Sequence, residues 1–134
     1  MKLSEAVRKA GRVYIIGNGG SYANAVHMAN DLLSVGVKAF TLDPASLTAS
    51  ANDFGYETVF SRWLKVVGEP GDLLIALSGS GTSKNILEAM DAANEIGMRY
   101  HLVTRYLSDL DMQESEEEQI RLGHEVMKDI RDCR

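Results

Sequence analysis

Short apolar segments bounded by turn-forming residues recur along the chain and predict buried β-strands. Three of them are almost continuously apolar, and they cover Arg12–Ile16, Asp72–Leu77 and Arg99–Thr104. A strand with one face in water alternates between apolar and polar residues, whereas a parallel strand covered on both faces does not. The three segments therefore predict parallel strands, and the shorter segment Lys38–Leu42 is a more ambiguous fourth candidate.

Helical segments lie between and around these strands. Helices are predicted over Leu3–Ala10, Tyr22–Leu33, Glu57–Val67, Ser83–Ile96 with Gly97 as its C-cap, and a long charged tail from about Gln113 to Arg134. Alternation of strand and helix at this spacing is typical of βαβ units with right-handed crossovers. We therefore expect residues 1–134 to form a single α/β domain with three layers, an open and mainly parallel sheet of the flavodoxin or Rossmann type, and a C-terminal helix.

Composition narrows the class of protein. The 14 Lys and Arg residues are outnumbered by 19 Asp and Glu, and the formal net charge of −5 argues against nucleic-acid binding through a basic face. The single cysteine, Cys133, rules out a disulfide within the chain and fits a reducing compartment. No segment approaches the roughly 18 apolar residues of a membrane span, and the N-terminus lacks a signal-peptide core. These features predict a soluble, cytoplasmic domain without nucleic-acid or membrane partners.

Two turns rich in glycine and serine follow predicted strands, at Gly17–Ser21 and Ser78–Ser83. Glycines allow a ligand to approach the backbone N–H groups closely, and the helix that follows adds partial positive charge. The second turn lacks the lysine of a Walker A loop, and the first lacks the third glycine of a dinucleotide fingerprint. The pair favours an anion site for a sugar phosphate, with no nucleotide cofactor. The alternative interpretation is that both are tight turns with helix N-caps.

Several sequence blocks, in this order, resemble one known family. They are GNGGS followed by H-x-x-x-D, then LTASANDFGYETVFSR, PGDLLIALSGSGTSKNILEA and GMRYHLVT. Over Arg12–Thr104 the chain resembles the sugar isomerase (SIS) fold and, more closely, the bacterial phosphoheptose isomerases. The resemblance implies an aldose–ketose isomerase that converts sedoheptulose 7-phosphate to D-glycero-D-manno-heptose 7-phosphate through an enediol(ate).

The resemblance also assigns substrate contacts. The phosphate falls on Ser78, Ser80 and Ser83, with the backbone of Gly79 between them. The further residues expected to contact substrate are Asn18, Gly19, Ser21, Asp53 and Glu116. For Asp53 a second interpretation remains open, since an aspartate after Asn52 could simply form an Asx turn.

A histidine and a carboxylate stand four residues apart on a predicted helix. On that helix His27 and Asp31 share a face that points away from the apolar residues meant for the sheet. They could form a solvated surface pair, or they could line a cleft if another element covers them. The tail helix is a candidate cover, because His124 shares an apolar stripe with Ile120 and Met127. The alternative for His124 is a packed core or interface histidine.

The resemblance implies chemistry for these residues. Asp31 and His124 correspond to the acid/base pair, expected on opposite sides of the substrate, although the family carries glutamate where this chain has the shorter Asp31. The family can also hold Zn²⁺ at the same place, and the matching residues are His27, Asp31, Glu116 and His124. A metal-free acid/base pair and a zinc site both remain open.

Assembly is the last expectation from the resemblance. The family is longer and oligomeric, so we expect a homo-oligomer, a tetramer or a dimer, with sites between subunits and the tail helix packed on a neighbouring chain. Arg105 is a candidate for a positive group near the substrate. The alternative function is a non-catalytic SIS module that binds a sugar phosphate or a protein partner.

Overall fold

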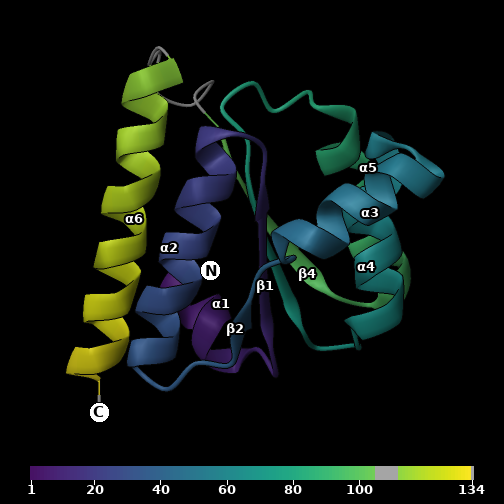
Figure 1. Cartoon of the computed structure of the whole chain (residues 1–134). Coiled ribbons are helices and arrows are strands. Elements are labelled where there is room, and N and C mark those ends of the chain that lie inside the picture. The colour runs from purple at the N-terminus through teal and green to yellow at the C-terminus, as the bar shows by residue number, and fades with distance from the viewer. Residues whose placement is uncertain (105–111, 134) are drawn as a thin grey trace.

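The computed structural model of the chain describes residues 1–104 and 112–133 (Figure 1). Four strands form one sheet in the order β2-β1-β3-β4, and each neighbouring pair is parallel. Their bounds are β1 Val13–Gly17, β2 Ala39–Phe40, β3 Leu73–Leu77 and β4 Arg99–Val103. The parallel sheet predicted from the apolar segments is confirmed, although the strand expected over Lys38–Leu42 shortens to two residues. Arg105 lies outside the described residues.

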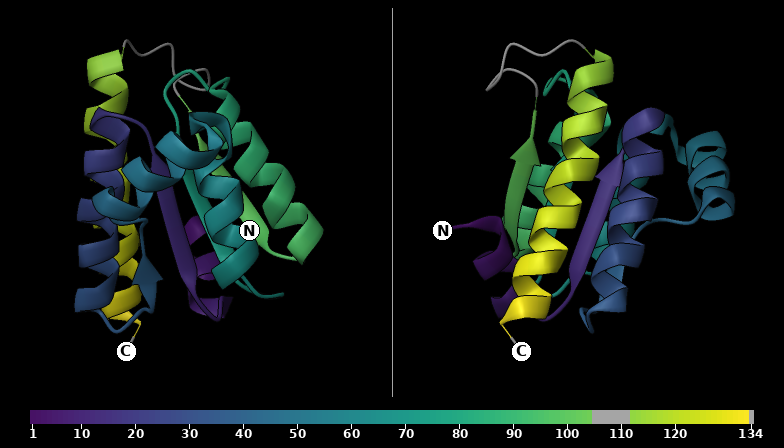
Figure 2. Two further views of the ribbon diagram at one scale, coloured as in Figure 1. Left: turned by 45° about the vertical axis from the view of Figure 1, so that its right-hand side comes forward. Right: turned by 90° about the vertical axis from the view of Figure 1, so that its left-hand side faces the viewer.

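Helices cover both faces of this sheet and confirm the three-layer α/β/α architecture (Figure 2). One face carries α1 Leu3–Lys9, α2 Gly20–Ser34 and α6 Met112–Asp132. The opposite face carries α3 Pro44–Phe54, the 3-10 helix η1 Tyr56–Thr58, α4 Val59–Val67 and α5 Lys84–Ile96.

Alternate residues of the central strands pack into two separate cores. On β1, Val13 and Ile15 belong to the core beneath α1, α2 and α6, whereas Tyr14 and Ile16 belong to the core beneath α4 and α5. Every residue of β1 and β3 is buried. Because both faces of the sheet are covered at β1 and β3, these strands have no polar face, which explains their continuous apolar pattern. The strand β4, expected to be buried as well, lies at the edge of the sheet with Arg99 and Tyr100 exposed, so the prediction of burial is wrong there.

The helix α3 was not predicted from the sequence. The Asp43 side chain caps it by accepting a hydrogen bond from the backbone N–H of Ser46 at 2.9 Å, and Pro44 occupies its first turn. This hydrogen bond lowers the pKa of the Asp43 carboxyl. Because α3 continues to Phe54, Asp53 lies in its last helical turn, and the interpretation of Asp53 as an Asx-turn residue is wrong.

The tail helix α6 packs along α2 of the same chain, and the two run side by side in the same direction (Figure 1). Val126 and Ile130 of α6 are buried in the core with Val7 of α1. The tail helix is therefore covered on one side by its own chain, and the expectation that it also packs on a neighbouring chain stays a prediction. Although α6 is long, it is highly charged, and none of the described helices is long and apolar enough to cross a membrane.

Candidate active site

The first glycine-rich loop joins β1 to α2 and requires glycine for steric reasons. A Cβ on Gly17 would lie 2.6 Å from both the backbone carbon and the carbonyl oxygen of Ser21, so the strand meets the helix backbone directly. Gly19, two residues after Gly17, has φ +57°, a conformation that L residues rarely adopt. The loop therefore places Asn18 and the buried Ser21 at the end of the strand.

The second loop joins β3 to α5 and is held by its own hydroxyl groups. The Ser78 hydroxyl accepts a hydrogen bond from the N–H of Gly81 at 3.1 Å, and the Ser80 hydroxyl accepts one from Thr82 at 3.2 Å. Ser83 is the N-cap residue of α5, and its Oγ lies 3.4 Å from the Oγ of Ser80. The loop thus gathers three serines beside the start of a helix.

Both loops stand at the carboxyl ends of adjacent strands. From β1 the chain passes through α2 to β2, and from β3 it passes through α5 to β4, so the two connections diverge. Such a divergence opens the crevice in which open α/β sheets bind ligands. A cavity of about 100 Å³ lies here, lined by Asn18, Ser21, Leu77, Ser78, Gly79, Ser80, Ser83 and Glu116.

The structure brings together most of the predicted substrate residues, but not all of them. Gly19 lines a neighbouring cavity with Tyr22 and Tyr56. Asp53 is exposed at the end of α3, where its carboxylate accepts a hydrogen bond from Asn52 at 3.3 Å. The Glu116 carboxylate lies against Gly20, where an added Cβ would overlap it, at the first turn of α2.

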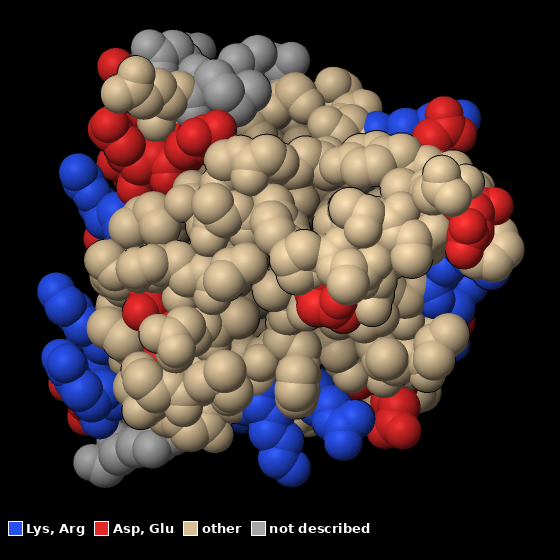
Figure 3. Space-filling view, in the orientation of Figure 1, with Lys and Arg blue, Asp and Glu red and all other residues tan. Residues whose placement is uncertain are grey.

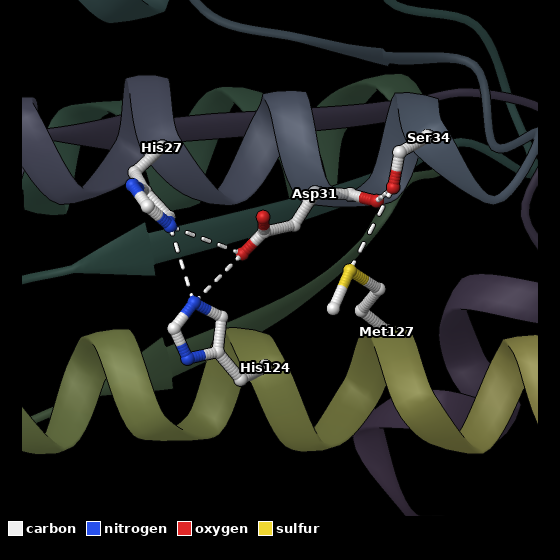
Figure 4. A network of polar contacts seen from close by, with 5 residues as sticks. All are labelled: His27, Asp31, Ser34, His124 and Met127. Atoms are coloured by element: carbon white, nitrogen blue, oxygen red, sulfur yellow. Dashed lines mark hydrogen bonds and ion pairs between the residues drawn. The ribbon is translucent and has the colours of Figure 1, made fainter.

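A second group of polar side chains, His27 and Asp31 of α2 and His124 of α6, meets further along the helix (Figure 4). The Asp31 Oδ2 atom lies 3.4 Å from Nε2 of His27 and 3.5 Å from Nε2 of His124. The two Nε2 atoms lie 3.2 Å apart. The tail helix therefore covers the outward face of α2 and turns an apparent surface pair into a three-residue site. Because Asp31 and His124 touch, they do not stand on opposite sides of a substrate, and that expectation is wrong.

The geometry of this group fits a zinc ion. The Asp31 side chain is only 13% exposed, and its Oδ2 is buried without a hydrogen-bond partner in the part of the chain that the structure describes. Zn²⁺ bonds to nitrogen and oxygen at about 2.0–2.1 Å, so two ligands of a tetrahedral site lie about 3.3 Å apart. The observed separations of 3.2, 3.4 and 3.5 Å match that edge length. Glu116, the fourth expected ligand, does not belong to the group.

The register of α6 on α2 depends on a glutamine that was not predicted as a functional residue. Gln119 is fully buried, donates to Ser21 Oγ at 3.1 Å and accepts from Asn24 at 2.9 Å. Asn24 also donates to the backbone carbonyl of Glu116 at 2.8 Å. These bonds hold Glu116 at the serine-lined cavity and, further along α6, His124 at His27. A polar residue on a charged helix carries no hydrophobic signal that would have revealed this role.

The sequence and the fold of the chain agree with those of one known family. A sequence profile of the SIS domain family matches residues 2–104, more than half of the chain. The chain therefore belongs to the SIS domain family, as its motifs predicted. Within that family it is 43% identical over 104 residues to the phosphoheptose isomerase of Akkermansia muciniphila, which covers 72% of this chain and 55% of that protein. The chain spans about half the length of the curated relatives it matches.

Solved structures point the same way. The phosphoheptose isomerase from Francisella tularensis superposes with a TM-score of 0.85 at 25% identity, covering 98% of this chain and 83% of that one. The phosphoheptose isomerase from Neisseria gonorrhoeae gives a TM-score of 0.84 at 29% identity, covering 96% and 80%. The chain thus shares both its sequence motifs and its fold with phosphoheptose isomerases.

Proposed function

We propose that this protein is an aldose–ketose isomerase of a phosphorylated sugar, with sedoheptulose 7-phosphate as the substrate. One observation carries the proposal: a single helix, α2, begins at the serine-lined cavity and presents His27 and Asp31 to His124 further along. The six helical steps from Ser21 to His27 rise about 9 Å, a span that an extended sugar phosphate can bridge. Similarity to phosphoheptose isomerases supports the choice of sugar.

The phosphate group would bind without a cationic side chain. The cavity is lined by serine hydroxyls, an amide and glycine backbone, and neither lysine nor arginine is among its described lining residues. The helices α2 and α5 both begin at these loops, so their N-termini face the cavity region. Helix N-termini offer free N–H groups and a partial positive charge, which suffice to hold a phosphate.

Isomerisation requires a base and an acid near the sugar carbonyl. We assign Asp31 as the base that takes the proton from C1 and His124 as the acid that protonates the C2 oxygen, which yields an enediol. The proton then returns to C2 while the C1 oxygen loses its own proton, which yields the aldose. Because Asp31 and His124 lie 3.5 Å apart, both would reach the substrate from the same side.

The reaction itself tests the proposal. The protein is incubated with sedoheptulose 7-phosphate in D₂O, and the sugar is followed by NMR. We expect heptose 7-phosphate to form and deuterium to enter beside the carbonyl, since the enediol exchanges its carbon-bound proton with solvent. Binding of the sugar without product or exchange would leave a non-catalytic sugar-phosphate module instead.

As the alternative to a metal-free acid/base pair, we propose that His27, Asp31 and His124 hold a zinc ion. In that case Asp31 and His124 would be metal ligands and would not exchange protons through the atoms that bind the ion. Three protein ligands with an open fourth position are typical of catalytic zinc sites. A bound zinc ion would polarise the substrate carbonyl as a Lewis acid. The match of the three ligand separations to a tetrahedron, together with the buried Asp31 oxygen that makes no hydrogen bond to a described residue, supports this assignment.

Metal content checks the zinc assignment directly. Protein purified without added zinc is expected to contain about one zinc per chain, and His27→Ala is expected to lose most of it, because two ligands rarely retain the ion. His101→Ala, which changes the histidine on β4 outside this group, is the matched control. Equal, near-zero zinc in all three samples would end the assignment.

Glu116 introduces a negative charge into the proposed phosphate site. Acidic side chains gather at the upper end of α6 (Figure 3), and the Glu116 carboxylate lines the cavity itself. Glu116→Gln is expected to tighten binding of inorganic phosphate by about 3- to 10-fold, because two like charges no longer share the site. Isothermal titration at low and high salt measures this, and the gain should shrink as salt screens the repulsion.

The control for Glu116 has the same change in net charge. Glu117 is the next residue on α6, is exposed, and does not line the cavity. Glu117→Gln should leave the phosphate affinity nearly unchanged. Equal gains in both variants would assign the effect to overall charge rather than to Glu116.

We further propose a homo-oligomer in the cytoplasm. Large apolar side chains remain exposed on two helices, Val26 and Leu33 on α2 and Val66 on α4, and their burial between copies would be favourable. The single cysteine supports the reducing compartment. Light scattering at micromolar concentration is expected to give the mass of a dimer or tetramer, and a monomer would contradict the assembly.

A further inference from the structure

The Asn18 side chain is held by two others within the described residues. Its Oδ1 accepts hydrogen bonds from the Tyr56 hydroxyl at 2.7 Å and from Asn85 Nδ2 at 2.8 Å. Its own Nδ2 donates to Asn85 Oδ1 at 2.9 Å, so the two amides form a reciprocal pair. Three hydrogen bonds hold this amide in place.

The two partners come from different parts of the chain. Asn85 is the second residue of α5, directly after the serine loop, and is only 3% exposed. Tyr56 begins η1 after Gly55, whose φ of +96° turns the chain there, and its side chain is 48% exposed. Asn18 therefore ties the first loop to the start of α5, directly after the serine loop, and to η1.

The orientation of this amide matters for an anion. Asn18 lines the serine cavity, and one of its two N–H bonds makes no hydrogen bond to any described residue. An amide has a donor end and an acceptor end, which exchange when the group turns by half a rotation. With the donor end free, Asn18 attracts a phosphate oxygen, whereas with the oxygen free it repels one.

We propose that Asn85 and Tyr56 are positioning residues of the anion site, which act by keeping the N–H of Asn18 available to the phosphate. This inference rests on the proposed function, because it requires that the serine-lined cavity binds phosphate. Neither residue is among those that line the cavity. Their effect on binding passes through Asn18.

A double-mutant cycle tests the inference. Titration calorimetry with inorganic phosphate is performed on the full chain carrying Tyr56→Phe, Asn85→Ala or Asn18→Ala, and on each pair that includes Asn18→Ala. Loss of one hydrogen bond corresponds to about a 2- to 10-fold change, so each single variant should raise Kd by that factor. On the Asn18→Ala background, neither second substitution should change Kd further, because residues that act through one group are not additive.

Matched measurements separate positioning from folding. Tyr22→Phe removes a hydroxyl that donates to the Leu42 carbonyl near the same loop, and it should leave Kd unchanged. Thermal unfolding of every variant identifies any general loss of structure. The exposed Tyr56→Phe should keep the wild-type Tm, so it remains informative even if the buried Asn85→Ala unfolds.

Each outcome bears on the inference separately from the proposed function. Wild-type protein that binds phosphate, with Tyr56→Phe binding equally well, overturns the positioning role and leaves the anion site intact. If Tyr56→Phe raises Kd by the same factor in the wild-type protein and on the Asn18→Ala background, the positioning role is overturned as well. Failure of the wild-type protein to bind phosphate overturns both the anion site and this inference.

Discussion

Replacing His124 with glutamine is expected to lower kcat for sedoheptulose 7-phosphate by about 10²- to 10⁴-fold, the usual contribution of a positioned acid or base. Glutamine keeps a polar side chain on α6 but cannot exchange a proton near neutral pH. It also removes one of three groups that converge within 4.8 Å on the proposed zinc site. The measurement is the rate of aldose formation, together with deuterium entry from D₂O.

The third histidine of the chain provides the control for this prediction. His101 lies on β4, outside the group formed by His27, Asp31 and His124. Burial lowers the pKa of His101, which favours the neutral form of its ring, so glutamine is a close replacement there. His101→Gln should retain the wild-type rate within a few fold. If His124→Gln also retained that rate, α6 would have no part in the chemistry.

Gly17→Ala is expected to destabilise the protein by about 2–3 kcal/mol and to weaken phosphate binding. Inserting an extra methyl group into a well-packed site reduces stability by an amount of this size. The new Cβ would lie 2.6 Å from the backbone of Ser21. Gly17 is paired with Leu77 in the sheet, and Ser21 is buried in the first turn of α2, so neither backbone can move freely. Urea unfolding measures the loss of stability, and titration with phosphate measures the loss of affinity.

A second glycine provides the control for this prediction, because alanine there adds the same methyl group at a place that has room for it. Gly123 lies inside α6, where an added Cβ would meet the flexible end of the Met28 side chain at 3.3 Å. Alanine also favours a helix interior by about 0.5–1 kcal/mol over glycine. Gly123→Ala should therefore be neutral or stabilising. Similar losses at both positions would show that close approach at Gly17 is not the cause.

The sheet and its loops could be predicted because their signals are local. Apolar segments such as Asp72–Leu77 are buried on both faces, so their composition alone distinguishes them from surface strands. Glycine and serine after such a strand must lie at its carboxyl end, since the chain direction is fixed within a βα unit. Buried parallel strands and loops at their carboxyl ends together place Asn18 and Ser78 at the same edge of the sheet, where the cavity lies.

Other features could not be predicted because they depend on contacts with distant residues. The helix α3 carries no fully buried residue, and only Leu47 and Ala51 pack against the core, so its amphipathic pattern is weak and its main signal is Asp43-Pro44 at its start. Nothing local distinguishes Asn85 from other polar residues at a helix start, yet it is buried against Asn18, 67 positions earlier in the chain. Glu116 was expected beside His124, but its position on α6 brings it to Gly20 instead.

His27 and Asp31 show which part of the site the sequence determines and which part only the tertiary structure determines. Their spacing of four residues on a helix already determined that they are neighbours on a face turned away from the sheet. Only the tertiary structure decided that His124 joins them, 97 positions later in the sequence. The helical period sets the direction of a side chain about its own axis, whereas the register between α2 and α6 is set by packing and by the buried Gln119.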